Sequence, residues 1–436
     1  MRSQRVSSIA LSASLACGVI CFAVPGTAKA QAHQAHQALQ AAQPSDSAQQ
    51  PVLTLDQAWQ RALRQHPDLR IAVAERDSAV AAGTQARAWP NPELSAQVED
   101  NRAETRTTTW QWSQPIEGSG KRAARVHAAD WAQKQADSQA EARLAQVRAS
   151  LVQAFHAAAV AQERAQLSAE LLELASRMRE AAGRRVTAGK AAPLEELKAQ
   201  VAQTQARSAV QAAQGEARVA WQALRQAAGD DLAGFQRAQS SPESLPDPQR
   251  WSTVLDRVDQ ANPLRMAEQE VGRQRAQAEV ERTRSNPDWV LQVGVKRDAQ
   301  LGRNQPMVGV ALPLALWDRN QGAHTAALRQ VDKAEASLDA TRASVRAQAV
   351  LAFEQLSSAV AQARSVRDAM QPSAAQALEL ASKGYELGKF GLLDVLDAQR
   401  TLFEVKSQLL SSREQAFRAE ARLIELFGDA DASPQP

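Results

Sequence analysis

WPNPELSAQVED (89–100) and TRTTTWQWSQ (105–114) are the two segments of this 436-residue chain from which its architecture follows. Proline lacks the backbone N–H that a helix interior needs, so the two prolines at the start exclude a helix there. In both segments apolar residues then alternate with polar ones, and Trp110 and Trp112 share one face. This period of two is typical of a strand with one apolar and one polar face. We therefore expect a pair of β-strands.

The pattern occurs twice. Asn91-Pro92-Glu93 recurs as Asn286-Pro287-Asp288, 195 positions later, and Ala188-Gly189-Lys190 recurs as Leu387-Gly388-Lys389, 199 positions later. Two further matches in the same order link 66–70 with 262–265 and 114–116 with 312–314. Nearly constant spacing indicates an internal repeat, each half reading helix, strand pair, long helix, shorter helix. The strands are expected at about 92–100, 105–115, 288–297 and 306–315.

The length and composition of these strands suit a membrane. Each has about ten residues, the length of a tilted transmembrane β-strand. No later segment approaches the roughly 20 apolar residues of a membrane helix, so a membrane crossing would use strands. Tryptophans lie in or beside the strands, as an aromatic girdle at the membrane interface requires: Trp89, Trp110, Trp112, Trp289 and Trp317. The alternative is two ordinary hairpins packed on a soluble core.

Four strands per chain are too few for a membrane-spanning barrel. Four strands can neither close a barrel nor cover their own edges. A membrane role therefore requires identical neighbours that supply the remaining strands.

Two helices of exceptional length are expected at about 121–186 and 322–387. Some 65 residues at 1.5 Å per residue extend on the order of 100 Å. Their apolar residues follow the three-four spacing of coiled coils, with alanine at many contact positions. Each helix should turn at a glycine, Gly189 or Gly388, into an antiparallel partner, and Pro372 should kink or break the second. The partner helices are expected at about 193–228 and 391–427.

The ends of the chain and its middle carry different signals. Residues 1–30 have the basic start, apolar core and Ala28-Lys29-Ala30 cleavage site of a signal peptide. A lipoprotein cleaved before Cys17 is the alternative. The expected divisions after the signal peptide are a disordered low-complexity segment at 31–50, a first repeat at 51–228, a linker at 229–250, a second repeat at 251–428 and a tail at 429–436.

Charge and motifs argue against other functions. The 51 basic residues outnumber the 48 acidic ones only through Arg2, Arg5 and Lys29 of the signal peptide, so nucleic-acid binding is not expected. Both cysteines also lie in that segment, which leaves no thiol chemistry. The segment 118–121 (GSGK) lacks the flanking residues of a phosphate-binding loop, and the histidines lack ligand or triad spacing. We expect no enzyme activity, cofactor or resident metal.

The sequence resembles the TolC-type outer-membrane efflux proteins over essentially the whole mature chain. The most specific stretch is GYELGK (384–389) with LDVLDAQ (393–399), which looks like the family's second hairpin turn. NPEL (91–94), QPIE (114–117) and WDRNQG (317–322) are similar to the branch that serves heavy-metal efflux, of the cobalt–zinc–cadmium type. The resemblance implies a mainly α fold with a small β part, in which long antiparallel coiled-coil helices join four strands per chain, and a trimer completes a 12-stranded barrel.

The resemblance also implies roles for residues at the hairpin tips. Asp394 and Asp397 match paired aspartates at the periplasmic entrance, and Glu195 lies at the equivalent place in the first repeat. Tyr385 matches a tyrosine that helps to hold the closed state, whereas Phe390, beside Lys389, stands where an arginine is expected. Asp394 and Asp397 alternatively serve only to favour the first turn of a helix. The tips resemble adaptor-contacting loops, through Arg185, Thr187, Gly189, Lys190, Gly388 and Phe390.

The family's role is that of a passive exit duct. The implied partners are two identical chains, outer-membrane lipid, a periplasmic adaptor and an inner-membrane resistance–nodulation–division pump, and the implied cargo is heavy-metal cations. One alternative is a channel of the same fold for drug efflux or type I protein secretion. Another, of a different class, is a periplasmic coiled-coil scaffold or adaptor.

Overall fold

A computed structural model describes most of the chain after the predicted leader. The described residues are 52–118, 120–230, 232–239, 241 and 244–428. They belong to one compact unit, residues 50–436. The predicted signal peptide, the predicted disordered segment 31–50 and the tail 429–436 lie outside the described residues.

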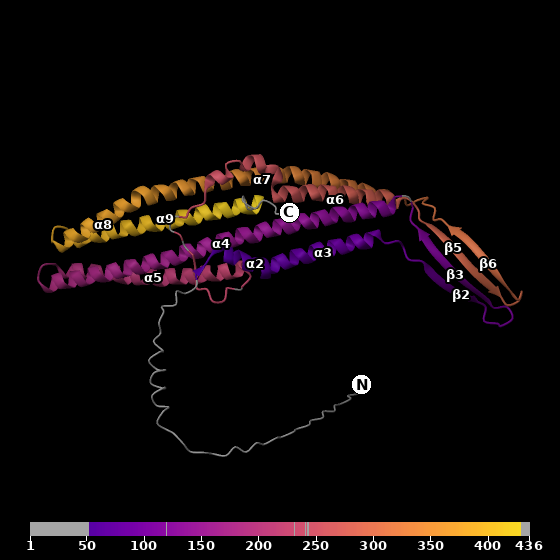
Figure 1. The fold of residues 1–436 in the computed structure, drawn as a ribbon, viewed down its shortest axis with the longest axis horizontal. Coiled ribbons are helices and arrows are strands. Elements are labelled where there is room, and N and C mark those ends of the chain that lie inside the picture. The colour runs from indigo at the N-terminus through magenta and orange to yellow at the C-terminus, as the bar shows by residue number, and fades with distance from the viewer. Residues whose placement is uncertain (1–51, 119, 231, 240, 242–243, 429–436) are drawn as a thin grey trace, which may run out of the picture. The chain divides into compact units, whose positions relative to one another are not determined.

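The same order of elements occurs in both halves of the described chain (Figure 1). The first half contains β1 (Val52–Leu53), α2 (Leu55–Gln65), α3 (Pro67–Arg87), β2 (Glu93–Glu99), β3 (Thr107–Ile116), α4 (Lys121–Thr187) and α5 (Pro193–Ala227). The second contains α6 (Asn262–Arg284), β5 (Trp289–Asp298), β6 (Arg303–Ala311), α7 (Gln321–Ser365), η3 (Val366–Met370), α8 (Gln371–Glu386) and α9 (Leu392–Phe427). Between them lie β4 (Arg237–Ala238) and the short 3₁₀ helices η1 (Pro248–Trp251) and η2 (Val254–Gln260).

The two long helices differ in one respect. α4 is unbroken over 67 residues, about 100 Å at the usual rise. The second long helix is interrupted by the π-helical turn η3, where the N–H of Gln371 donates to the carbonyl of Val366. Pro372 follows directly and has no N–H to continue the α-helical pattern. The predicted break at Pro372 is therefore a π turn that ends just before the proline.

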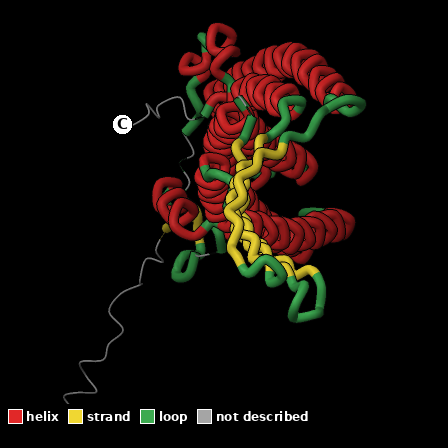
Figure 2. Tube along the Cα trace, turned by 90° about the vertical axis from the view of Figure 1, so that its right-hand side faces the viewer, coloured by secondary structure: helices red, strands yellow, loops and turns green. Residues whose placement is uncertain are grey.

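The four long strands form one antiparallel sheet in the order β2-β3-β5-β6 (Figure 2). Its last strand differs from the expectation of 306–315, because β6 begins at Arg303 and ends at Ala311. Arg303 already pairs with Asp298 after a short turn at Gly302, whose φ of +63° suits glycine. Pro313 has no N–H to extend the ladder, so Leu312, predicted on this strand, lies beyond it.

The register gives the sheet one apolar and one polar face. One row of directly paired residues is apolar across all four strands: Leu94, Trp112, Val293 and Val308. A row on the other face is largely polar: Gln97, Thr109, Lys296 and Gln305. Within the described residues the outer edges of β2 and β6 have no strand partner. The sheet thus has two open edges and an uncovered apolar face.

The segment 118–121 joins the sheet to α4. A Cβ on Gly118 would lie 2.6 Å from the Pro287 carbonyl oxygen, so only glycine permits this approach. The Gly118 N–H and the Lys121 ammonium both donate to the Asp288 carboxylate at 2.8 Å. The glycine-rich segment therefore connects the two halves at the base of the sheet.

α4 is the central helix of the bundle. It packs against α3 and α6 toward the sheet and against α5 and α9 along the rest of its length (Figure 1). Its buried residues are mostly alanine, which lets the backbones approach closely. None of the described helices is apolar over a stretch long enough to cross a bilayer.

The described residues between the halves contact both halves. β4 pairs in parallel with β1, and Arg413 of α9 is almost fully buried where its guanidinium bonds Glu163 of α4 at 2.6 Å and the Ser241 carbonyl at 2.9 Å. His156 stacks on the Phe417 ring with centroids 3.4 Å apart. Burial, with the nearby Arg413 charge, lowers the pKa of His156 to about 3.

Acid is expected to destabilise the protein through His156. Its pKa is near 6.5 when unfolded and about 3 when folded, so between these values the unfolded state binds more protons and stability falls as the pH falls. From pH 7 to 4.5 the loss is about 2.5 kcal/mol per chain. Thermal unfolding in detergent should show a weaker pH dependence for His156→Gln than for the wild type. An identical dependence in both proteins would contradict the prediction.

Candidate functional site

The two hairpin turns, from α4 to α5 and from α8 to α9, have the same backbone geometry. In the first, the Lys190 N–H donates to the Arg185 carbonyl at 2.8 Å. In the second, the Lys389 N–H donates to the Gly384 carbonyl at 2.8 Å. Gly189 and Gly388 both have positive φ, +67° and +71°, which closes each helix in the left-handed conformation. The turns lie at the opposite end of the helices from the sheet (Figure 1).

A small apolar core holds the two hairpins together near these turns. We call it the tip core. Its buried members are Met178, Ala182, Ala199, Ala381, Tyr385, Leu392 and Val395. Tyr385 is the largest of them and is 1% exposed. The predicted closed-state tyrosine thus lies inside the contact between the two halves.

Arg185 of the first hairpin contacts Tyr385 of the second. The guanidinium carbon lies 4.4 Å from the centre of the Tyr385 ring, and Nη1 donates to the Tyr385 carbonyl at 2.9 Å. Such a cation over an aromatic face is stabilising, more so when partly desolvated. Phe390 stands at the position where the family resemblance predicts an arginine. Its ring packs against Gly384, so closely that a Cβ on residue 384 would lie 2.0 Å from a ring carbon. An arginine therefore reaches this tyrosine from the other hairpin.

Glu195 also faces Tyr385. The Glu195 Oε2 and the Tyr385 hydroxyl are both buried, and Glu195 and Arg185 lie close enough to affect the hydroxyl. Burial raises the pKa of Tyr385, the Arg185 charge opposes this, and the Glu195 carboxylate adds to it. One oxygen of Glu195 is thus enclosed, while the residue as a whole is partly exposed. We call Arg185, Glu195 and Tyr385 the tip clasp.

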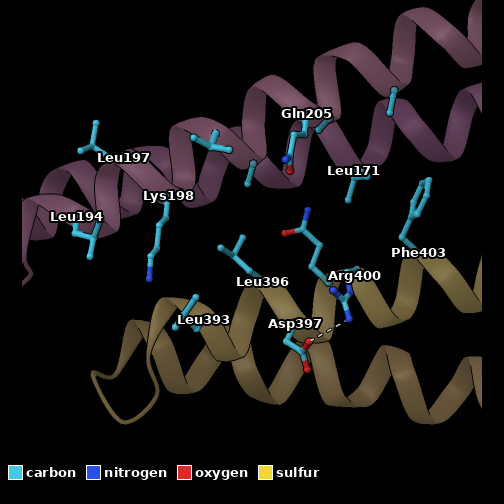
Figure 3. Close-up of a pocket in the computed structure, with 15 residues that line it drawn as sticks. Leu171, Leu194, Leu197, Lys198, Gln205, Leu393, Leu396, Asp397, Arg400 and Phe403 are labelled. Carbon is cyan, nitrogen blue, oxygen red and sulfur yellow. Dashed lines mark ion pairs between the residues drawn. The ribbon is translucent and has the colours of Figure 1, made fainter.

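Asp394 and Asp397 are exposed on the first two turns of α9. Asp394 Oδ2 accepts the Gly391 N–H at 2.9 Å, so this residue does cap its helix, as the alternative reading holds. Asp397 lies 4.0 Å from the Arg400 guanidinium. It lines a groove of about 710 Å³ between α5 and α9, with Arg400 beside it and Lys198 on the opposite wall (Figure 3). Exposed leucines of both helices line the same groove: Leu194, Leu197 and Leu393.

The other predicted tip residues lie on the turns themselves. Thr187, Lys190, Gly388 and Lys389 are exposed, and Phe390 is half exposed. Gly189 is also exposed. Arg185 is only partly exposed, because its guanidinium donates a hydrogen bond to the Tyr385 carbonyl. The turns therefore expose two lysines and a phenylalanine to solvent.

The predicted aromatic girdle is exposed throughout. Its members are between 39% and 88% exposed: Trp89, Trp110, Trp112, Trp289 and Trp317. Trp110 and Trp112 share the apolar face of the sheet with Val293 and Val295, to which they pair directly. An exposed patch of this many large apolar side chains indicates a surface that contacts lipid or another chain.

Sequence reasoning missed Arg400 and one contact of Arg185. Arg185 was expected to contact an adaptor, but the structure also brings it to Tyr385, 200 positions away. Arg400 had no expected role, although its position three residues after Asp397 on a helix already placed the two on one face. Within the described part of the chain, no three histidine, cysteine or acidic side chains are grouped so as to hold a metal ion.

The fold and the tips identify the class of protein. Residues 58–230 and 255–429 match the family described as outer membrane efflux protein, and the chain belongs to this family. It is an outer-membrane component of the tripartite efflux type, with a helical tunnel in the periplasm of a Gram-negative cell. The expected fold class, TolC-like, is confirmed.

The chain is similar to individual proteins of known name or structure. The chain is 37% identical over 376 residues to the cobalt-zinc-cadmium resistance protein CzcC of Cupriavidus metallidurans, covering 86% of this chain and 90% of that protein. It is 28% identical over 291 residues to the nickel-cobalt-cadmium resistance protein NccC of Alcaligenes xylosoxydans xylosoxydans, covering 65% of each. Among solved structures, the outer membrane protein VceC of Vibrio cholerae has a TM-score of 0.69 at 19% identity, covering 86% of this chain and 96% of that one. CusC has a TM-score of 0.64 at 20% identity, covering 85% and 90%.

Proposed function

We propose that this chain forms a homotrimeric outer-membrane duct that exports heavy-metal cations. Energy comes from an inner-membrane pump of the resistance–nodulation–division type, coupled through a periplasmic adaptor, and the duct itself performs no catalysis. The cargo is proposed from the likeness to CzcC, whose name states cobalt, zinc and cadmium resistance.

One observation carries the duct proposal: the four-stranded sheet with an apolar face and two open edges. Open edges invite pairing with another chain, and closure removes them. Three copies supply twelve strands, which close a barrel with the apolar row of Leu94, Trp112, Val293 and Val308 toward lipid. Trp89, Trp289 and Trp317, which lie at or beyond strand ends, are then near a membrane interface, whereas Trp110 and Trp112 face lipid nearer the middle of the sheet. The polar row lines the water-filled interior.

The hairpin tips form the entrance of the proposed duct. Three copies of Asp394 and Asp397 place carboxylates around a narrow opening, where they attract cations and repel anions. The tip clasp joins the two hairpins of each chain and favours the closed arrangement. The exposed turns, with Lys190, Lys389 and Phe390, form the surface for the adaptor.

Deleting the gene tests the cargo. The deletion strain is expected to lose resistance to at least one of cobalt, zinc, cadmium, copper, silver and nickel, with the inhibitory concentration falling several-fold. Expression of the wild-type chain should restore growth. Unchanged resistance to the whole panel, together with new sensitivity to drugs or a loss of protein secretion, would assign the duct to another cargo.

A further inference from the structure

We propose that Arg400 sets the cation selectivity of the entrance by offsetting part of the aspartate charge. This inference rests on the proposed entrance at Asp394 and Asp397. The guanidinium lies 4.0 Å from Asp397 and 3.3 Å from Glu404, one turn further along the same face of α9. Arg400 thus stands between two carboxylates on the wall that the entrance aspartates occupy.

The contacts leave the Arg400 charge at the surface of the groove. Its side chain is 73% exposed and that of Asp397 is 75% exposed. Arg400 and Asp397 both line the α5–α9 groove, and Figure 3 shows the ion pair on its α9 wall. A pair this exposed adds little to stability. Its effect is on the electrostatic potential that an approaching ion meets.

The effect of Arg400 on the electrostatic potential depends on how many charged groups lie within one Debye length of it. Three residues of helix rise about 4.5 Å, well inside the Debye length of about 8 Å at physiological ionic strength. In a trimer, three guanidinium groups therefore act within one screening length of the three Asp397 carboxylates and offset part of their charge, which they share with Glu404. Asp394 lies six residues away, about 9 Å along the helix, and its charge is offset less. Arg400 makes the entrance moderately cation-selective and keeps a divalent cation from being held there.

Removing the Arg400 charge tests the proposal. Trimers of Arg400→Gln are reconstituted in planar bilayers, and the reversal potential is measured in a KCl gradient. The ratio of K⁺ to Cl⁻ permeability should rise about threefold. The CoCl₂ concentration that halves the current should also fall about threefold, because the enrichment of a divalent cation and the ratio of K⁺ to Cl⁻ both depend on twice the local potential. Arg400→Lys should behave like the wild type.

Arg418 provides a matched control on the same helix. It is 60% exposed and pairs with Glu414, one turn away, at 2.9 Å. Eighteen residues separate it from Arg400, which is five helical turns, so it lies on the same face about 27 Å away. Arg418→Gln should leave both measurements unchanged. An equal shift in both variants would overturn the assignment to the entrance.

A double variant separates this inference from the proposed entrance. Asp394→Asn with Asp397→Asn should lower cation selectivity, and if it does not, the entrance itself is elsewhere. If the double variant lowers selectivity while Arg400→Gln changes neither the permeability ratio nor the CoCl₂ block, only the role of Arg400 fails. Both variants change exposed side chains, and their trimer yield in outer-membrane fractions checks assembly.

Discussion

Val293→Arg is expected to abolish most of the heat-resistant trimer in outer-membrane fractions. Val293 lies on the central strand β5, paired with Trp112 on one side and Val308 on the other, in the middle of the apolar face. A cationic side chain at the midplane of a lipid-facing barrel wall costs about 2–4 kcal/mol. The trimer carries this cost three times, about 6–12 kcal/mol, which is comparable with the whole stability of a typical protein.

Gln292→Arg is the matched control for this prediction. Gln292 is the preceding residue of the same strand and therefore points to the opposite, polar face, which already holds Lys296. Its trimer yield, measured by gel mobility with and without heating, should stay near that of the wild type. Equal trimer yields for Val293→Arg and the wild type would contradict the proposal that this face of the sheet contacts lipid. That result is the one expected of a soluble scaffold.

Tyr385→Ala is expected to open the tips and to raise single-channel conductance several-fold. The side chain is buried in the tip core, and truncating a large aromatic residue in a core costs about 3–5 kcal/mol. The variant also removes the ring that Arg185 covers. Both losses weaken the contact between the hairpins, which the proposed closed state needs.

Tyr385→Phe separates the ring from the hydroxyl. The ring provides the packing in the tip core and the surface that Arg185 covers, so Tyr385→Phe should stay much nearer the wild-type conductance than Tyr385→Ala. Arg185→Ala should open the tips partly, since the aromatic core stays. A Tyr385→Ala channel that conducts like the wild type would show that the tip clasp does not hold the entrance closed.

Local pattern was sufficient for most of the fold. The alternation around Trp110 and Trp112, the two matched Asn-Pro turns and the three-four spacing of the long helices each report a short-range rule, because strand and helix periods repeat every two to four residues. The glycines of the two turns were found for the same reason, since a left-handed helix end selects glycine locally. Strand ends were less certain: β6 starts at Arg303 because of its pairing with β5, which no local period reports.

The family resemblance located the tips, and only the tertiary structure showed what their residues touch. Arg185 and Tyr385 are 200 positions apart, and their contact exists because two helical hairpins pack against each other over an alanine-rich seam. The same packing encloses one oxygen of Glu195, whereas Asp394, its equivalent in the repeat, remains exposed. The period of a sequence indicates on which face of a helix or strand a residue lies. Which other element packs against that face depends on contacts between residues far apart in the sequence. The amino-acid pattern alone thus determined the strands and the long helices, while the contacts of the tip clasp were decided by how the two halves pack together.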